Sequence, residues 1–196
     1  NTDPKLIKEM RDYYFNQIKT YKKNKNKKIT IDKMPLNLVH VGEILRFFPN
    51  AKFILALRHP YDCVLSCFMQ NFMLNHAMAN FLNLDDTLKL YDLTMSLWKK
   101  YTNVFIIDHH LIRYEDVVSN FKKTIGDLLK FLNVKWSDNV IEFYKTAEKR
   151  GIINTPSYNQ VSQPIYSNSM YRWKNYEKEF SKSNISLENW VKEFNY

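Results

Sequence analysis

The chain reads Phe53-Ile54-Leu55-Ala56-Leu57-Arg58-His59-Pro60 at the point that decides its fold. A run of strand formers stops at an arginine, and Pro60 presets the backbone for a first helical turn. We therefore expect a buried parallel strand that leads into a helix, with Arg58 at the carboxyl end of the strand. Ser66 follows two turns into that helix. A guanidinium, a helix N-terminus and a hydroxyl group favour an anion site, most naturally for a phosphate.

Composition restricts the class of protein further. The chain has 196 residues, of which 45% are hydrophobic and 15% aromatic, so we expect one domain over residues 1–196 with a sizeable core. The formal net charge of +9 favours a nucleotide, a nucleic acid or an anionic membrane surface as partner. Cys63 and Cys67 lie one helical turn apart without suitable disulfide geometry, which favours a reducing, cytoplasmic location.

Helical and extended patterns alternate along the chain. Apolar stripes and first-turn signals predict helices over residues 4–22, 38–48, 60–74, 85–101, 120–132 and 137–150. Strand formers predict strands over residues 29–31, 52–57, 104–107 and 110–113. Strands separated by helices of this length need crossover connections, so the fold class is α/β with a mostly parallel sheet. Ligands are expected at the carboxyl ends of the strands.

Five motifs then follow one another in a recognisable order: Ile31 to Asn37, Phe48 to Ile54, Arg58 to Ser66, Arg113 to Asp116, and Gln163 to Tyr166 leading to Arg172-Trp173. Together they resemble the sulfotransferase family, and most closely the TPR-linked bacterial sulfotransferases and the tyrosylprotein sulfotransferases. The resemblance implies a P-loop-NTPase-like parallel sheet flanked by helices. It also implies transfer of a sulfuryl group from 3′-phosphoadenosine 5′-phosphosulfate to a hydroxyl acceptor, which is a protein tyrosine, a carbohydrate or a small molecule.

The resemblance assigns roles to seven side chains and implies no metal. The residues that would bind the nucleotide are Arg58, Ser66, Tyr114, Arg172 and Trp173. The residues that would lie near the sulfuryl group, and so count as catalytic, are Lys33 and Ser157. The plainer alternatives are a strand-capping arginine for Arg58, a solvent-facing serine for Ser66, a surface side chain for Lys33 or Arg172, and a packed side chain for Tyr114 or Trp173.

The family's first phosphate-binding loop and the acceptor base of the tyrosylprotein branch would both precede Asn1. The chain thus resembles the carboxyl-terminal two-thirds of the fold without its first βα unit, and a fragment, a split gene product and a degenerate protein all stay open. We expect such a chain to be impaired or inactive alone, because losing even one donor to a transition state costs ~10²-fold in rate. An unpaired sheet edge would also favour oligomers.

The main alternative function is a basic module that binds nucleic acid or an anionic surface through a decayed sulfotransferase fold. It predicts affinity for long polyanions that falls steeply with salt. Under the sulfotransferase hypothesis no specific nucleic acid partner is expected. A P-loop nucleotide kinase is disfavoured, because the sequence has only three glycines and their spacing does not match the Walker motif. His109 and His110 are adjacent in a predicted strand and point to opposite faces, which argues against a metal site.

Overall fold

The computed structural model describes residues 3–21, 29–145 and 165–196. The backbone forms two compact units, of which one comprises Asn1–Phe53 and Ser96–Asp108 and the other comprises Ile54–Met95 and His109–Tyr196. The long helix α4, Leu84–Val104, contributes residues to both units. The single domain expected over residues 1–196 stays a prediction.

The first unit is helical. Besides the second half of α4, its described elements are α1 (Pro4–Tyr21), η1 (Pro35–His40) and α2 (Val41–Phe47). Side chains from two helices bond to backbone carbonyl groups: Arg11 Nε donates to Phe47 O at 2.8 Å, and Tyr101 Oη donates to Val39 O at 2.9 Å. These bonds tie α1 to the end of α2, and α4 to η1.

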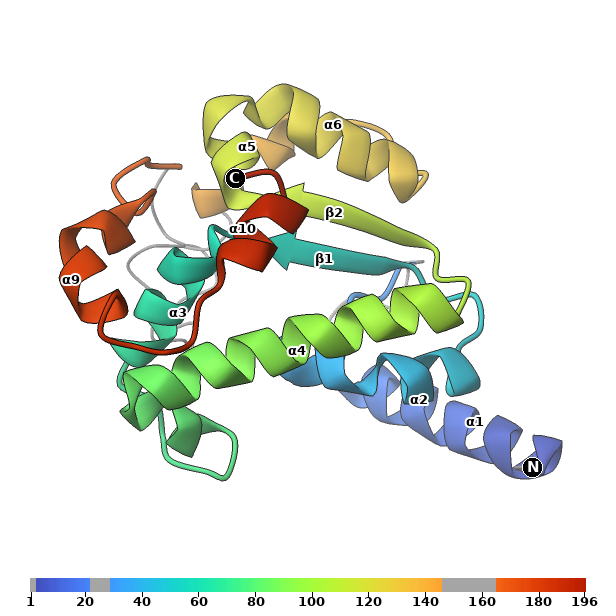
Figure 1. The fold of residues 1–196 in the computed structure, drawn as a ribbon. Coiled ribbons are helices and arrows are strands. Elements are labelled where there is room, and N and C mark those ends of the chain that lie inside the picture. Colours follow the sequence, from blue (N-terminus) through green and yellow to red (C-terminus); the bar gives the residue numbers. More distant parts are fainter. Residues whose placement is uncertain (1–2, 22–28, 146–164) are drawn as a thin grey trace. The chain divides into compact units, whose positions relative to one another are not determined.

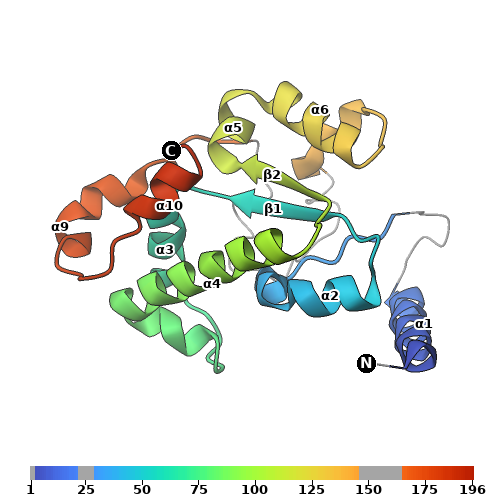
Figure 2. The same cartoon turned by 45° about the vertical axis from the view of Figure 1, so that its right-hand side comes forward.

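The second unit is built around a two-stranded parallel sheet. Strands β1 (Phe53–Leu57) and β2 (His109–Arg113) lie side by side and point the same way in Figures 1 and 2. The other elements described in this unit, besides the first half of α4, are α3 (Pro60–Phe68), η2 (Met78–Leu82), α5 (Tyr114–Ser119), α6 (Phe121–Phe131), η3 (Asp138–Val140), η4 (Arg172–Tyr176), α9 (Glu177–Phe180) and α10 (Glu188–Glu193). Helices α5 and α6 pack on β2, while α3 packs on η4. The predicted α/β class is confirmed.

Strand β1 leads into α3 as the sequence predicts. Pro60 begins the helix, at a position whose N–H would have no helical partner. Within β1, Leu55 and Leu57 are buried, whereas Ile54 is exposed. The strand is therefore buried on the face that carries Leu55 and Leu57, while Ile54 and Ala56 on its other face are exposed.

Two predicted strands are wrong. Residues 29–31 form no strand, and Ile31 is 73% exposed. Residues 104–107 instead end α4 and turn toward β2, since the Phe105 N–H donates to Tyr101 O at 2.8 Å in helical fashion. A strand requires a hydrogen-bonded neighbour, and an apolar run does not show whether one is present.

Helix boundaries also differ from the predicted ones. The helix predicted over 60–74 ends at Phe68, and the one predicted over 38–48 begins as the 3₁₀ helix η1. Helix α5 was not predicted, because six residues are too few to show a helical period.

In the described part of the chain, no helix combines the length and the apolar character that crossing a membrane requires.

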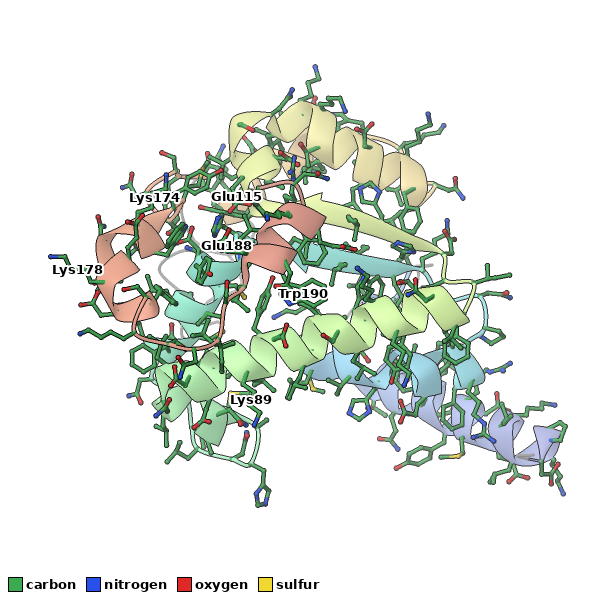
Figure 3. The ribbon with its side chains drawn as sticks, in the orientation of Figure 1. Lys89, Glu115, Lys174, Lys178, Glu188 and Trp190 are labelled. Carbon is green, nitrogen blue, oxygen red and sulfur yellow. The ribbon has the colours of Figure 1, made fainter. Side chains whose placement is uncertain are left out.

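The C-terminal residues are tied into the second unit. Figure 3 shows Trp190 pointing from α10 toward α4, where its Nε1 donates to Asp92 Oδ1 at 2.7 Å. The Leu187 N–H donates to Tyr61 Oη of α3 at 3.1 Å. Arg113, at the end of β2, donates to Asn195 O at 2.6 Å. The end of the chain thereby contacts α3, α4 and the carboxyl end of the sheet.

Two helical glycines give opposite expectations for stability. A Cβ at Gly126 in α6 would meet no atom within 4 Å, so Gly126→Ala should raise the free energy of unfolding by about 0.5–1 kcal/mol. A Cβ at Gly42 in α2 would lie 3.1 Å from Tyr101 Cε1. Because of this tight contact, Gly42→Ala should not raise the free energy of unfolding. Urea unfolding followed by circular dichroism measures both, and equal stabilisation by the two changes would contradict this packing.

Candidate functional site

Arg58 lies where β1 ends, as predicted. Its guanidinium donates through Nη2 to the carbonyl oxygen of Ser169, and its Cζ lies 5.6 Å from the centre of the Tyr114 ring. Arg58 Nε is buried, and it has no hydrogen-bond partner among the residues that the structure describes. Arg58 thus bonds to Ser169, which is distant in sequence, and its Nε remains a buried donor without a partner among the described residues.

Tyr114 holds the same distant part of the chain from another side. It begins α5, directly after β2, and its Oη donates to Tyr166 O at 2.7 Å. Burial raises the pKa of Tyr114, so the phenol stays protonated and able to donate. Arg58 and Tyr114 therefore both bond to carbonyl groups within residues 166–169.

Asp62 holds the next stretch of that segment, and the sequence analysis did not identify it. It lies in the first turn of α3 and is 1% exposed. Its Oδ2 accepts from the Tyr171 N–H at 2.6 Å, and its Oδ1 accepts from the Trp173 N–H at 2.8 Å. The only signal in the sequence was its position four residues after Arg58, within the motif that runs to Ser66.

Arg172 is thereby brought to α3. Its Nη2 lies 3.9 Å from the sulfur of Met69, the residue that caps the C-terminus of α3. Ser66 stands on the last turn of the same helix and is exposed. The structure therefore places Arg58 beside Tyr114 at the end of β1, and Arg172 at the C-terminal end of α3, the helix that also carries Ser66.

Trp173 packs on aromatic neighbours. Its ring stacks on His59, with centroids 5.1 Å apart and an interplanar angle of 16°, and on Tyr61 at 4.9 Å. His59 is 4% exposed, and burial lowers its pKa. The backbone N–H of His59 donates to Oε1 of the buried Glu115 at 3.0 Å. Glu115, also missed from the sequence, therefore fixes the turn between β1 and α3.

The two residues predicted to be catalytic, Lys33 and Ser157, stay predictions. Lys33 belongs to the first unit, where it is exposed and precedes η1. Its neighbour Asp32 accepts from Tyr14 Oη at 2.8 Å, and burial together with this bond raises the pKa of Tyr14 to about 12. Ser157 lies outside the described residues.

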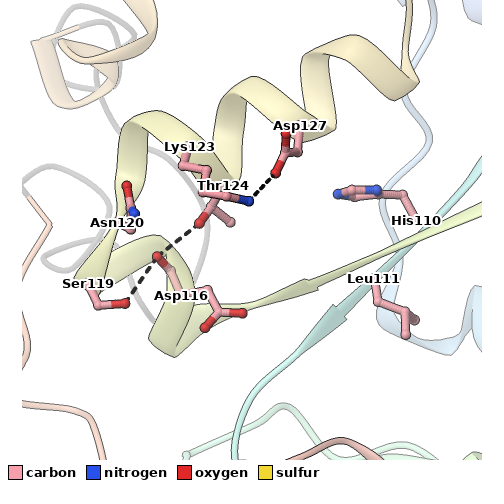
Figure 4. Close-up of a pocket in the computed structure, with 8 residues that line it drawn as sticks. All are labelled: His110, Leu111, Asp116, Ser119, Asn120, Lys123, Thr124 and Asp127. Carbon is pink, nitrogen blue, oxygen red and sulfur yellow. Dashed lines mark hydrogen bonds and ion pairs between the residues drawn. The ribbon is translucent and has the colours of Figure 1, made fainter.

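The second unit contains two cavities, neither of which is lined by Arg58. One of about 340 Å³ is lined by α5, α6 and β2, and Figure 4 shows Lys123 and Asp127 paired along its rim at 2.8 Å. The other, of about 240 Å³, is bordered by Trp173 together with Glu177 and Glu188. Carboxylates line both cavities, which makes each a poorer place for a phosphate than the region around Arg58. Within the described ranges, no cluster of side chains is suited to bind a metal ion.

Comparison with known proteins identifies the family. A model of the sulfotransferase family matches residues 4–138, and the chain belongs to that family. This confirms the resemblance drawn from the sequence motifs. The sulfotransferase domain from the curacin biosynthetic pathway is similar in structure, with a TM-score of 0.68 over 95% of this chain and 68% of that one. Since its sequence identity is 18%, this similarity supports the fold alone.

Two curated relatives are similar in sequence. An uncharacterized protein of Aquifex aeolicus (strain VF5) is 31% identical over 90% of this chain, and protein-tyrosine sulfotransferase 1 of Danio rerio is 27% identical over 72%. The chain spans 23% of the length of the first and 41% of the second.

The pKa values of Cys63 and Cys67 are shifted in opposite directions, chiefly by the hydrogen bond between the two thiols. The Cys63 thiol donates to the Cys67 sulfur, which lowers the pKa of Cys67, and the guanidinium of Arg58 lowers it further. The same bond, together with burial, raises the pKa of Cys63. Both thiols are half-buried and neither forms a disulfide.

We expect iodoacetamide to alkylate Cys67 with a pH midpoint below the ordinary thiol value of 9.0, because the thiolate is the nucleophile. Cys63→Ala should move this midpoint upward, since the hydrogen bond that stabilises the thiolate is lost. Mass spectrometry of the labelled peptide measures the midpoint, and Cys67→Ala is the control for labelling at Cys63. A midpoint unaffected by Cys63→Ala would contradict the hydrogen bond.

Proposed function

We propose that this chain is part of an enzyme that transfers a sulfuryl group from 3′-phosphoadenosine 5′-phosphosulfate to a hydroxyl acceptor. The observation that carries the proposal is Arg58 at the end of β1, which lies against Tyr114 and keeps a buried Nε without a partner among the described residues, while Arg172 reaches the C-terminal end of α3. Membership of the sulfotransferase family supports the reaction class.

The 3′-phosphate of the nucleotide is assigned to Arg58, Ser66 and Arg172. Arginine offers a planar fork of donors that matches phosphate oxygens, and a serine hydroxyl adds a neutral donor. Trp173 and Tyr114 are assigned to the edge of the nucleotide pocket, where Tyr114 also holds the segment that carries Arg172.

The side chains present fit such a group. The buried Nε of Arg58 lacks a partner in the described part of the chain, and a buried donor of this kind costs free energy until an acceptor reaches it. Arg172 is exposed, and its Nη2 lies 3.9 Å from the thioether sulfur of Met69, which is a weak acceptor. Both guanidinium groups therefore gain stronger partners when an anion binds.

The reaction requires positive charge near the bridging oxygen of the donor. When bound, the nucleotide supplies the sulfuryl group and leaves as adenosine 3′,5′-bisphosphate. Lys33 and Ser157 are assigned to that end of the donor, where an ammonium group stabilises the developing charge and a hydroxyl orients an oxygen by hydrogen bonding. No metal ion is part of this proposal.

The acceptor is proposed to carry a hydroxyl group on a protein tyrosine, a carbohydrate or a small molecule. The tyrosine acceptor has support from the similarity to protein-tyrosine sulfotransferase 1 of Danio rerio. A cytoplasmic location and an oligomeric state stay predictions.

Nucleotide binding is the first test. By calorimetry, Arg58→Ala should weaken adenosine 3′,5′-bisphosphate binding by ~10–100-fold, because a charge-assisted hydrogen bond contributes about 1.5–3 kcal/mol. Binding of 5′-AMP, which lacks the 3′-phosphate, should change little. Arg46→Ala, an exposed arginine of α2, is the matched control. Salt-sensitive binding of long polyanions, without preference for the 3′-phosphate, would favour the nucleic-acid or anionic-surface alternative instead.

Sulfuryl transfer is the second test. In the full-length gene product, Lys33→Ala should lower kcat by ~10²-fold or more while donor binding stays nearly unchanged, since the lysine acts on charge that develops during transfer. Lys89→Ala, an exposed lysine on α4, is the control. Transfer of radiolabelled sulfate to a panel of peptides, glycans and alcohols measures kcat. Bound donor without transfer to any acceptor would argue against the enzyme.

A further inference from the structure

Asp62 is the side chain best placed to set the position of Arg172. Its two carboxylate oxygens accept from the backbone N–H groups of Tyr171 and Trp173, the two residues that flank Arg172. The carboxylate is 1% exposed, so these two bonds lie out of water. A buried carboxylate that accepts two N–H bonds holds both donors firmly, because releasing either would leave it short of a partner.

The backbone at this point shows why such a hold is needed. Tyr171 adopts a left-handed conformation with φ 54°, which is unfavourable for a residue with a side chain and persists only where surrounding contacts maintain it. Helix η4 begins directly afterwards at Arg172. The bonds to Asp62 span this turn on both sides.

We propose that Asp62 is a positioning residue for nucleotide binding, which acts by holding Arg172 against the end of α3. This inference rests on the proposed function. Asp62 itself has both oxygens occupied by the backbone and does not contact the ligand. Its contribution reaches the 3′-phosphate only through the guanidinium of Arg172, whose Nη2 already lies 3.9 Å from Met69 Sδ.

An effect of the negative charge of Asp62 and a positioning role of Asp62 predict opposite changes in anion affinity when that charge is removed. If Asp62 acted through its negative charge alone, removing that charge would strengthen the binding of an anion. If it acts by holding Arg172, removing the charge weakens binding, because an asparagine offers one acceptor oxygen and turns its NH₂ group toward the second N–H donor.

The experiment is a double-mutant cycle on Asp62→Asn and Arg172→Ala, with adenosine 3′,5′-bisphosphate as the calorimetric probe. We expect each single change to weaken binding by ~10-fold and the double change to weaken it no further than Arg172→Ala alone. The matched control is Asp85→Asn, which removes the same charge from the first turn of another helix, α4. It should leave the affinity unchanged.

Each outcome decides between the two claims. Tighter or unchanged binding by folded Asp62→Asn, or additive losses in the double variant, would overturn the role of Asp62 and leave the proposed function standing. Wild-type affinity in Arg172→Ala would overturn it too, even if Asp62→Asn failed to fold. Absence of nucleotide binding by the wild-type chain would instead overturn the proposed function, and the inference with it.

Discussion

The structure around the strand end depends on how three partly or fully buried charges are satisfied. Arg58, Asp62 and Glu115 lie within the turn from β1 to α3 or against it, and each would cost several kcal/mol without a partner. Each bonds to backbone: Arg58 to a carbonyl, Asp62 to two N–H groups and Glu115 to one. Among the described residues no carboxylate pairs with Arg58, so its charge stays available to an anion.

Backbone partners also explain why the C-terminal segment follows the site so closely. Residues 166–173 meet Tyr114, Arg58 and Asp62 in succession, and the partners of Asp62 lie more than 100 residues away in sequence. Such contacts close long loops, which is entropically costly, and buried charge-assisted bonds offset that cost. The same bonds that complete the fold place Arg172 beside α3. Arg172 therefore reaches its place beside α3 when residues 166–173 fold.

The sequence predicted what is local and missed what depends on distant partners. The strand end at Arg58, the helix at Pro60 and the class of fold follow from patterns within a few residues. Asp62 and Glu115 were missed because an acidic residue near a helix start looks the same whether it faces solvent or accepts buried N–H bonds. The strands expected over 29–31 and 104–107 failed for a related reason: strand formation is decided by a neighbour that the pattern does not contain.

In the proposed function, Arg58 is organised for an anion before the anion binds. A guanidinium has five N–H donors, and the bond to Ser169 uses Nη2 while Nε stays buried without a described partner. Under the proposed function, a phosphate bonds to the remaining donors of Arg58 while Nη2 keeps its bond to Ser169. The free-energy costs of desolvating Arg58 and of ordering residues 166–173 are already borne when the chain folds. Both costs would otherwise be subtracted from the binding free energy, so a site organised in this way retains more of the attraction between guanidinium and phosphate.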